Sequence, residues 1–309
     1  MSGSPLSASA YEILGVAPSA TEDELRRAYR LRLRETHPDT GGDDAAFIRV
    51  RRAWELIGTV EARAAYDRGS SADAGSEWRV TPTEAPRTDS RPRARSHGHP
   101  GGWRRERYLE LVREWAGRGA DLADPYAPEL VRSAPDELRL LLAGALAEEA
   151  TARTIAHLGI GFTVWHGVMA GAPGRIADGH RILDHVVLSP SGLYGIASAD
   201  FGGEVRFRRG ELIGDAVRGE TPVASLLAGM RATAKAARVR FGGAIVVLPD
   251  DALPQPVTPL GSVRGVPVVV VRRSVLGHLL RQGVPGARPV GGNELFDVRT
   301  RLQQTVRFV

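Results

Sequence analysis

The sequence predicts a multidomain α + α/β chain, with a helical hairpin at the N-terminus and a larger α/β domain after it. Two apolar stripes at helical spacing, over residues 22–34 and 46–57, flank a short polar loop. Residues 70–102 are then rich in Ser, Pro, Arg and Gly and show no hydrophobic period. Beyond residue 159, short runs of β-branched residues alternate with turns. We therefore predict two folded domains joined by a disordered linker.

The first stripe is typical of a helix that begins after Thr21. Thr21 is a suitable N-cap, and three acidic residues follow in the first turn, where the helix dipole favours negative charge. The stripe itself is Leu25, Ala28, Tyr29, Arg32 and Leu33, and the arginines at 26, 27, 30 and 34 face solvent. The second stripe is Ala46, Phe47, Val50, Ala53, Trp54 and Ile57. Two such stripes joined by a polar loop bury each other as an antiparallel hairpin.

The loop of this hairpin contains His37, Pro38 and Asp39. Pro38 fixes φ and removes a backbone donor, so it stiffens the turn and keeps His37 out of helical geometry. Asp39 then presents a carboxylate on a short, preorganised arm.

Residues 8–69 resemble the J domain of the DnaJ co-chaperone family. The family's elements occur in order: the short helix signature at 11–16, the basic helix, His37-Pro38-Asp39, the run at 47–57, and a closing "R-x-x-Y-D" turn ending at Asp67. The resemblance implies that the partner is a DnaK-type ATP-driven chaperone. In the family, the basic helix docks on an acidic chaperone surface, and the loop aspartate engages a basic residue near the interdomain linker.

The resemblance implies that six residues of this chain bind the chaperone: His37, Pro38, Asp39, Arg26, Arg27 and Arg30. In the family, contact with these residues biases the chaperone toward ATP hydrolysis, and the chemistry takes place on the chaperone. We therefore predict a co-chaperone without a catalytic residue rather than an enzyme. Without the loop, the three arginines would be interpreted as an ordinary solvated helix face.

Composition excludes several classes of protein. The 309 residues include no cysteine, which excludes disulfides and cysteine-ligated zinc. The start of the chain has no apolar signal region, and no run of eighteen apolar residues occurs, so we predict a cytoplasmic protein without a membrane partner. The net charge of +5 is small for a chain of this length. Nearly all of the positive charge comes from arginine, so the charge supports nucleic-acid binding only weakly. No P-loop or dinucleotide motif indicates a cofactor.

We predict four segments: the J domain at 1–69, the linker at 70–102, a helical lead-in at 103–135 and an α/β domain at 136–309. His97 and His99 in the linker are too few for a metal site. The lead-in has an apolar stripe of Tyr108, Leu111, Val112 and Trp115 surrounded by arginines. We interpret the stripe as core and the arginines as its solvated face, although an aromatic and arginine helix could also grip nucleic acid.

The α/β domain begins with a long helix over 136–158. The expected strands are 162–168, 181–188, 193–197, 205–208, 243–248 and 268–271, with helices over 222–238 and 293–309. Continuous Val and Ile runs suggest strands buried on both faces. The order of elements implies a mixed central sheet.

Residues 183–196 resemble the signature of the nuclease-related domain (NERD) family, which has a restriction-endonuclease-like fold. The resemblance covers about residues 136–285, and residues 144–150 resemble its "G-x-x-G-E-E-x" entry with Ala147 in place of the second glycine. It implies metal-dependent phosphodiester cleavage, in which Asp184 and Glu148 would be carboxylate ligands. The family's "I-E-T-K" would add a carboxylate and a lysine, but Ala197 and Ala199 stand there. We therefore predict a nuclease-like binding module with an inactive site and no metal.

Alternatives remain open at this site. Asp184 is either a buried carboxylate bonded to turn backbone or to an arginine, or a residual metal or ligand residue. The alternative function is a Mg²⁺-dependent nuclease that uses Asp184, Glu148 and a displaced acid such as Asp200 or Glu204. A third is non-cleaving nucleic-acid binding. We interpret His185 as core or partner-facing, and the client of this domain is unknown.

Overall fold

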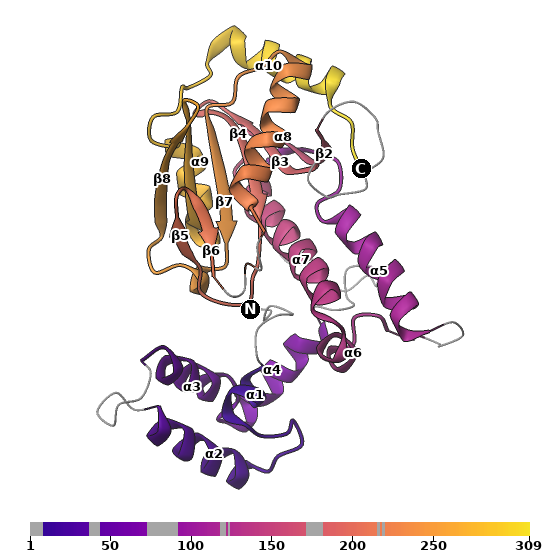
Figure 1. Ribbon diagram of the computed structural model, residues 1–309, viewed down its shortest axis with the longest axis vertical. Helices are drawn as coiled ribbons and strands as arrows, with labels where there is room; N and C mark the ends of the chain where they lie inside the picture. The colour runs from indigo at the N-terminus through magenta and orange to yellow at the C-terminus, as the bar shows by residue number, and fades with distance from the viewer. Residues whose placement is uncertain are drawn as a thin grey trace. The chain divides into compact units, whose positions relative to one another are not determined.

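The computed structural model describes residues 9–36, 44–72, 92–117, 122, 124–170, 182–214, 217 and 220–309 (Figure 1). His37, Pro38 and Asp39 lie outside these residues. The chain forms two compact units, Met1–Ala85 with Leu122–Ala134, and Pro86–Asp121 with Pro135–Val309. Every helix in the described part of the chain is too short or too polar to cross a membrane.

The first unit is helical, as the sequence predicts. It contains α1 (Ala10–Leu14), α2 (Glu22–Glu35), α3 (Asp44–Ile57), α4 (Val60–Ala72) and α6 (Pro128–Ser133). Thr21 caps α2 in a capping box with Glu24, so the predicted helix start is confirmed. The core of the hairpin is buried between α1, α2 and α3, and it consists of Ala10, Tyr11, Leu14, Leu25, Val50, Ala53 and Ile57.

Hydrogen bonds connect α1 with α4. The Tyr11 hydroxyl donates to Asp67 Oδ1 at 2.8 Å and accepts from Arg63 Nε at 3.0 Å. The Ala10 N–H donates to the Tyr66 hydroxyl at 3.0 Å. Arg63, Tyr66 and Asp67, which the sequence predicted as a closing turn, lie within the helix α4 and hold it against α1.

The second unit contains a seven-stranded sheet with the order β1-β2-β3-β4-β7-β9-β8. The strands are β1 (Arg95–His97), β2 (Thr163–Met169), β3 (Ile182–Ser189), β4 (Gly192–Ser198), β7 (Gly243–Leu248), β8 (Val257–Val263) and β9 (Val266–Arg272). A separate pair is β5 (Arg206–Arg208) with β6 (Glu211–Ile213). β2, β3 and β4 form an antiparallel meander, whereas β4, β7 and β9 are parallel. The predicted mixed sheet is confirmed.

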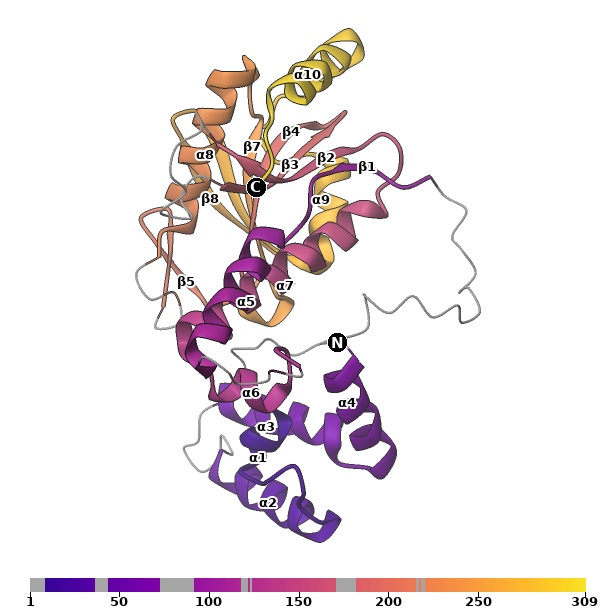
Figure 2. The same ribbon diagram turned by 90° about the vertical axis from the view of Figure 1, so that its right-hand side faces the viewer.

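Helices cover both faces of this sheet (Figure 2). The described helices of this unit are α5 (Gly102–Ala116), α7 (Asp136–Ala156), α8 (Pro222–Ala237), α9 (Leu276–Gln282) and α10 (Gly292–Thr305), with 3₁₀ turns at Asp250–Ala252 and Arg273–Val275. Met230 of α8 and Leu302 of α10 belong to one core, whereas Ile155 of α7 and Leu280 of α9 belong to the other. α5 packs on α7.

Three predicted boundaries are wrong. The linker does not extend to residue 102, because β1 pairs in parallel with β2, and three polar residues of an edge strand give no hydrophobic period. The lead-in at 103–135 is not one segment, because α5 belongs to the second unit and α6 to the first. The last helix ends at Thr305, and Phe308 then forms an antiparallel bridge with Val168.

Candidate functional site

The first candidate site is the basic face of α2. Arg26, Arg27 and Arg30 are exposed, and Arg26 forms an ion pair with Glu22 one turn earlier. A hollow of about 220 Å³ lies between α2 and α3, lined by Arg26, Tyr29, Arg30 and Trp54. The rings of Tyr29 and Trp54 stack with centroids 4.4 Å apart. The face thus combines positive charge with two stacked aromatic rings, which suits an acidic and partly apolar partner surface.

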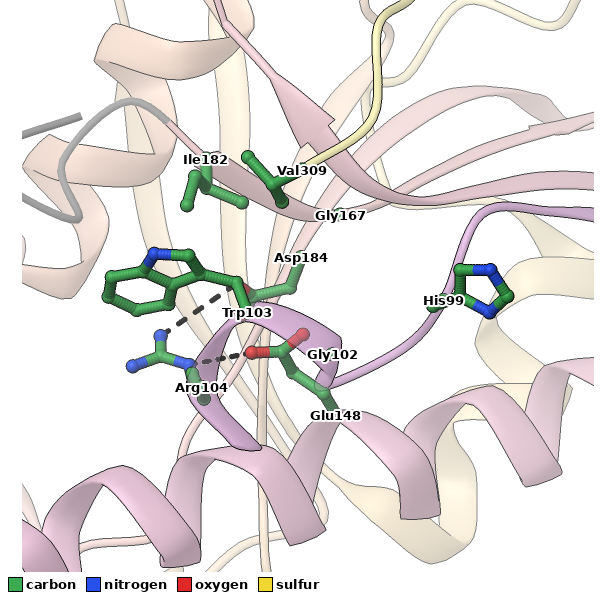
Figure 3. Close-up of a pocket in the computed structure, with 9 residues that line it drawn as sticks. All are labelled: His99, Gly102, Trp103, Arg104, Glu148, Gly167, Ile182, Asp184 and Val309. Carbon is green, nitrogen blue, oxygen red and sulfur yellow. Dashed lines mark hydrogen bonds and ion pairs between the residues drawn. The ribbon is translucent and has the colours of Figure 1, made fainter. Parts of the chain in front are cut away.

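The second candidate site joins Glu148 of α7 and Asp184 of β3 (Figure 3). Both carboxylates are buried, with exposed fractions of 4% and 7%. Glu148 Oε2 accepts from the Gly101 N–H at 2.9 Å, and Asp184 Oδ2 accepts from the Ser198 N–H at 2.7 Å. The fold therefore brings together two residues that the sequence analysis singled out.

Arg104 of α5 reaches both carboxylates. Its Nε donates to Glu148 Oε1 at 2.6 Å, and a terminal nitrogen lies 3.8 Å from Asp184 Oδ1. About a third of the Arg104 side chain is exposed. The interpretation of the α5 arginines as a purely solvated face is wrong here, and Arg105 likewise pairs with Glu149 at 2.8 Å.

The charges in this cluster perturb one another. Burial and the neighbouring Asp184 raise the pKa of Glu148 to about 8, while Arg104 opposes that shift. Burial also raises the pKa of Asp184, against Arg104 and the Ser198 N–H. Burial alone would lower the pKa of Arg104, but the two carboxylates raise it, so the guanidinium stays charged. Arg104 therefore supplies the positive charge that these acids need.

The other residues of the expected nuclease site do not complete it. Ala197 and Ala199 flank Ser198 and have neither a ligand atom nor a charge. Asp200 Oδ1 accepts from the Gly202 N–H at 2.9 Å, and Glu204 is exposed. Among the described residues, no three His, Asp or Glu side chains are grouped to hold a metal ion. The cluster does not fit a magnesium site, because Arg104 occupies the oxygens that a cation would use.

A cavity of about 10 Å³ remains beside the cluster, which is about the space of one water molecule. Its walls include Trp103, Ile182 and Val309 in addition to the charged residues (Figure 3). Sequence reasoning missed Arg104, which lies 44 positions from Glu148, and no local spacing signals that pairing. The arrangement pairs one guanidinium with two buried acids beside a space of about one water molecule.

His185 is fully buried, in agreement with its interpretation as a core residue. Its Nδ1 lies 2.7 Å from Nδ1 of His166, and its Nε2 lies 3.2 Å from the Ser198 hydroxyl. The same Ser198 therefore contacts Asp184 through its backbone and His185 through its side chain.

Comparison with known proteins concerns the first unit. The family model described as "DnaJ domain" matches residues 9–67. This region is similar to "Chaperone protein DnaJ" of Gloeothece citriformis, at 45% identity over an alignment of 73 residues, which covers 21% of this chain and 20% of that protein. It is also similar to "Chaperone protein DnaJ" of Thermosynechococcus vestitus, at 46% over 65 residues, 20% of this chain and 17% of that protein.

A plant relative shows the same pattern. The "DnaJ protein homolog" of Cucumis sativus is 43% identical over 58 residues, 19% of this chain and 14% of that protein. The chain thus covers a fifth or less of the length of each of these relatives. Together with the capped helical frame, these similarities establish that residues 9–67 are a J domain of the DnaJ type.

Proposed function

We propose that the chain is a J-domain co-chaperone that stimulates the ATPase of a DnaK-type chaperone. The observation that supports this proposal is the J domain itself, with Arg26, Arg27 and Arg30 exposed on α2. Complementary charge would speed the encounter with an acidic chaperone surface and fix its register. His37, Pro38 and Asp39 lie outside the described residues, and their proposed role is to couple docking to ATP hydrolysis in the chaperone.

A single-turnover ATPase assay with a DnaK-type chaperone tests this function. The wild-type chain should accelerate hydrolysis, and His37→Gln should not. The matched control is His278→Gln, because His278 is exposed on α9 in the second unit. Circular dichroism checks that each variant is folded. Equal stimulation by the wild type and His37→Gln would contradict the proposal.

We also infer that the second unit is a nuclease-like binding module whose hydrolytic site is inactive. The support is that Arg104 pairs with both Glu148 and Asp184, while Ala197 and Ala199 stand where a ligand and a cation are required. The restriction-endonuclease-like fold and the binding role both belong to this proposal. It makes the second unit the part of the chain that selects a client.

The competing function is a Mg²⁺-dependent nuclease, and the convergence of Glu148 and Asp184 is the observation that favours it. The test is incubation of the full chain with single- and double-stranded DNA in Mg²⁺ or Mn²⁺. We expect no cleavage. Cleavage that disappears in Asp184→Ala would overturn the inactive-site proposal. Binding without cleavage, with a steep salt dependence, would identify the client as nucleic acid.

A further inference from the structure

Two arginines from distant parts of the chain lie next to Thr163, the first residue of β2. Arg95 of β1 is paired with Thr163 in parallel register, so the two side chains lie on the same face of the sheet. From α10, the Nε–H of Arg299 donates to Thr163 Oγ1 at 3.1 Å. Figure 2 shows α10 on one side of the sheet at β2 and α7 on the other. The pairing of β1 and the packing of α10 therefore bring Arg95 and Arg299 to one end of the sheet.

No carboxylate of the described residues balances these two positive charges. Neither Arg95 nor Arg299 forms an ion pair in the part of the chain that the structure describes. The nearest acid along α10 is Asp297, which lies two positions before Arg299 and therefore on another side of the helix. Burial, with a further effect from Arg95, lowers the pKa of Arg299, as expected for like charges that face each other. This end of the sheet therefore has an excess of positive charge.

A third nitrogen on the same face lacks a partner. His97 follows Arg95 by two positions and is paired with Trp165, so its side chain lies on the face of Arg95 and Thr163. The rings of His97 and Trp165 stack with centroids 5.9 Å apart. The Nε2 atom of His97 is buried and has no hydrogen-bond partner among the described residues. Such a nitrogen calls for a further polar group, and it can carry the proton that an anion would accept.

We propose that Arg95 and Arg299 form a binding site for a phosphoryl group, as inorganic phosphate or a small phosphate monoester. Thr163 holds the Nε of Arg299, so the terminal nitrogens of that guanidinium are left for the ligand. A guanidinium matches two oxygens of a phosphate, and two guanidinium groups balance the charge of its dianion. A carboxylate has one charge and two oxygens, so it fits this pair less well. The inference uses no residue of the proposed chaperone-binding or nuclease-like sites, so its failure would leave those proposals untouched.

Isothermal titration of the full chain with inorganic phosphate, at constant ionic strength, tests this site. We expect the wild type to bind phosphate at one site, and Arg299→Met to bind it about tenfold more weakly, because a charge-assisted hydrogen bond is lost. The matched control is Arg301→Met, because Arg301 is exposed on the same helix and donates to the Arg238 carbonyl. Methyl phosphate, titrated in parallel, distinguishes free phosphate from a monoester as the preferred ligand. Absence of binding, or an equal loss in both variants, would overturn the proposal.

The variant Arg95→Met provides a readout that a merely structural role would not change. Arg95 is exposed, so we expect the variant to fold. Without phosphate and at low salt, its urea midpoint should be higher than that of the wild type, because the repulsion between two guanidinium groups is removed. With saturating phosphate the order should reverse, because the wild type binds the ligand more tightly. Phosphate also stabilises folded proteins by exclusion from their surface, but that effect is common to both chains. Midpoints that keep the same order under both conditions would contradict the site.

Discussion

The Nδ1 atoms of His166 and His185 lie 2.7 Å apart inside the second unit. One must donate and the other accept, and the neighbours decide which. The Ser198 hydroxyl donates to Thr151 Oγ1 at 2.9 Å, so it accepts from Nε2–H of His185 at 3.2 Å. His185 Nδ1 is then the acceptor and His166 Nδ1 the donor. His166 Nε2 accepts from the Ser96 hydroxyl at 3.0 Å, and both rings are neutral.

This neutral pair predicts a loss of stability in acid. Burial, with smaller effects from His97 and His99, lowers the pKa of His166 to about 4, and burial and His166 lower the pKa of His185. Because the folded pKa lies below that of the unfolded chain, the stabilisation is complete above pH 6.5. It is lost as the pH falls toward 4, by about 3 kcal/mol for His166 alone. Urea unfolding of the full chain between pH 7.5 and 4.5 measures this loss.

The variant His166→Gln separates this effect from the titration of carboxylates. We expect a shallower decline of the unfolding free energy below pH 6.5 than in the wild type. His278→Gln, at an exposed position on α9, is the matched control. Parallel pH profiles for the wild type and His166→Gln would show that the histidine pair is not responsible.

Arg104→Met should destabilise the second unit, because Glu148 and Asp184 lose the positive charge that pairs with them. Loss of one partner of a buried ion pair costs about 3–5 kcal/mol, and we expect about 2–3 here because a third of the Arg104 side chain is exposed. The pKa of Glu148, already about 8, lies above its unfolded value, so protonation relieves the repulsion below that pH. The measured penalty should therefore be larger at pH 8.5 than at pH 5.5.

Two companion variants make this comparison specific. Glu148→Gln combined with Arg104→Met should recover part of the lost stability, because one buried charge is then removed. Arg105→Met breaks the neighbouring pair with Glu149 and should show less dependence on pH. A pH-independent penalty for Arg104→Met would mean that packing, rather than charge, is its contribution.

Arg30→Glu should weaken stimulation of the chaperone ATPase about tenfold at low salt, because charge reversal on the docking face opposes an acidic partner. The difference from the wild type should narrow as salt screens the interaction. Arg52→Glu, at an exposed position on α3, is the matched charge control. If Arg30→Glu and Arg52→Glu reduce stimulation equally, net charge and not the α2 face governs the encounter.

Tyr11→Phe should lower the unfolding free energy of the J domain by about 1–2 kcal/mol, because Asp67 and Arg63 lose their shared partner. The change keeps the aromatic ring of residue 11, whose centroid lies 5.9 Å from that of the Tyr66 ring. Tyr29→Phe is the control, because the Tyr29 hydroxyl makes no hydrogen bond among the residues that the structure describes. Thermal unfolding followed by circular dichroism at 222 nm would compare them, and equal midpoints would contradict the prediction.

The helical frame and the inner strands could be predicted from sequence because their side chains repeat with a clear period. Leu25 and Val50 mark helices, and the Val run of β9 marks a strand buried on both faces. By contrast, β1 and the segment at Phe308 are held by backbone pairing, which leaves no side-chain pattern in the sequence.

The charged cluster was only half predictable. Glu148 and Asp184 could be named from a resemblance, but the guanidinium between them comes from a helix in the predicted lead-in. His166 and His185 meet because β2 and β3 pair in one register, and that register follows from the whole sheet. Relations of this kind depend on tertiary packing, so local propensity does not reveal them.

The bond between Tyr11 and Asp67 fastens the beginning of the J domain to its end. This bond and the bond from the Ala10 N–H to the Tyr66 hydroxyl join α1 to α4, so the two ends of the matched region lie together before the chain continues past residue 67. This explains in mechanical terms how one segment can be common to proteins of which it forms a fifth or less.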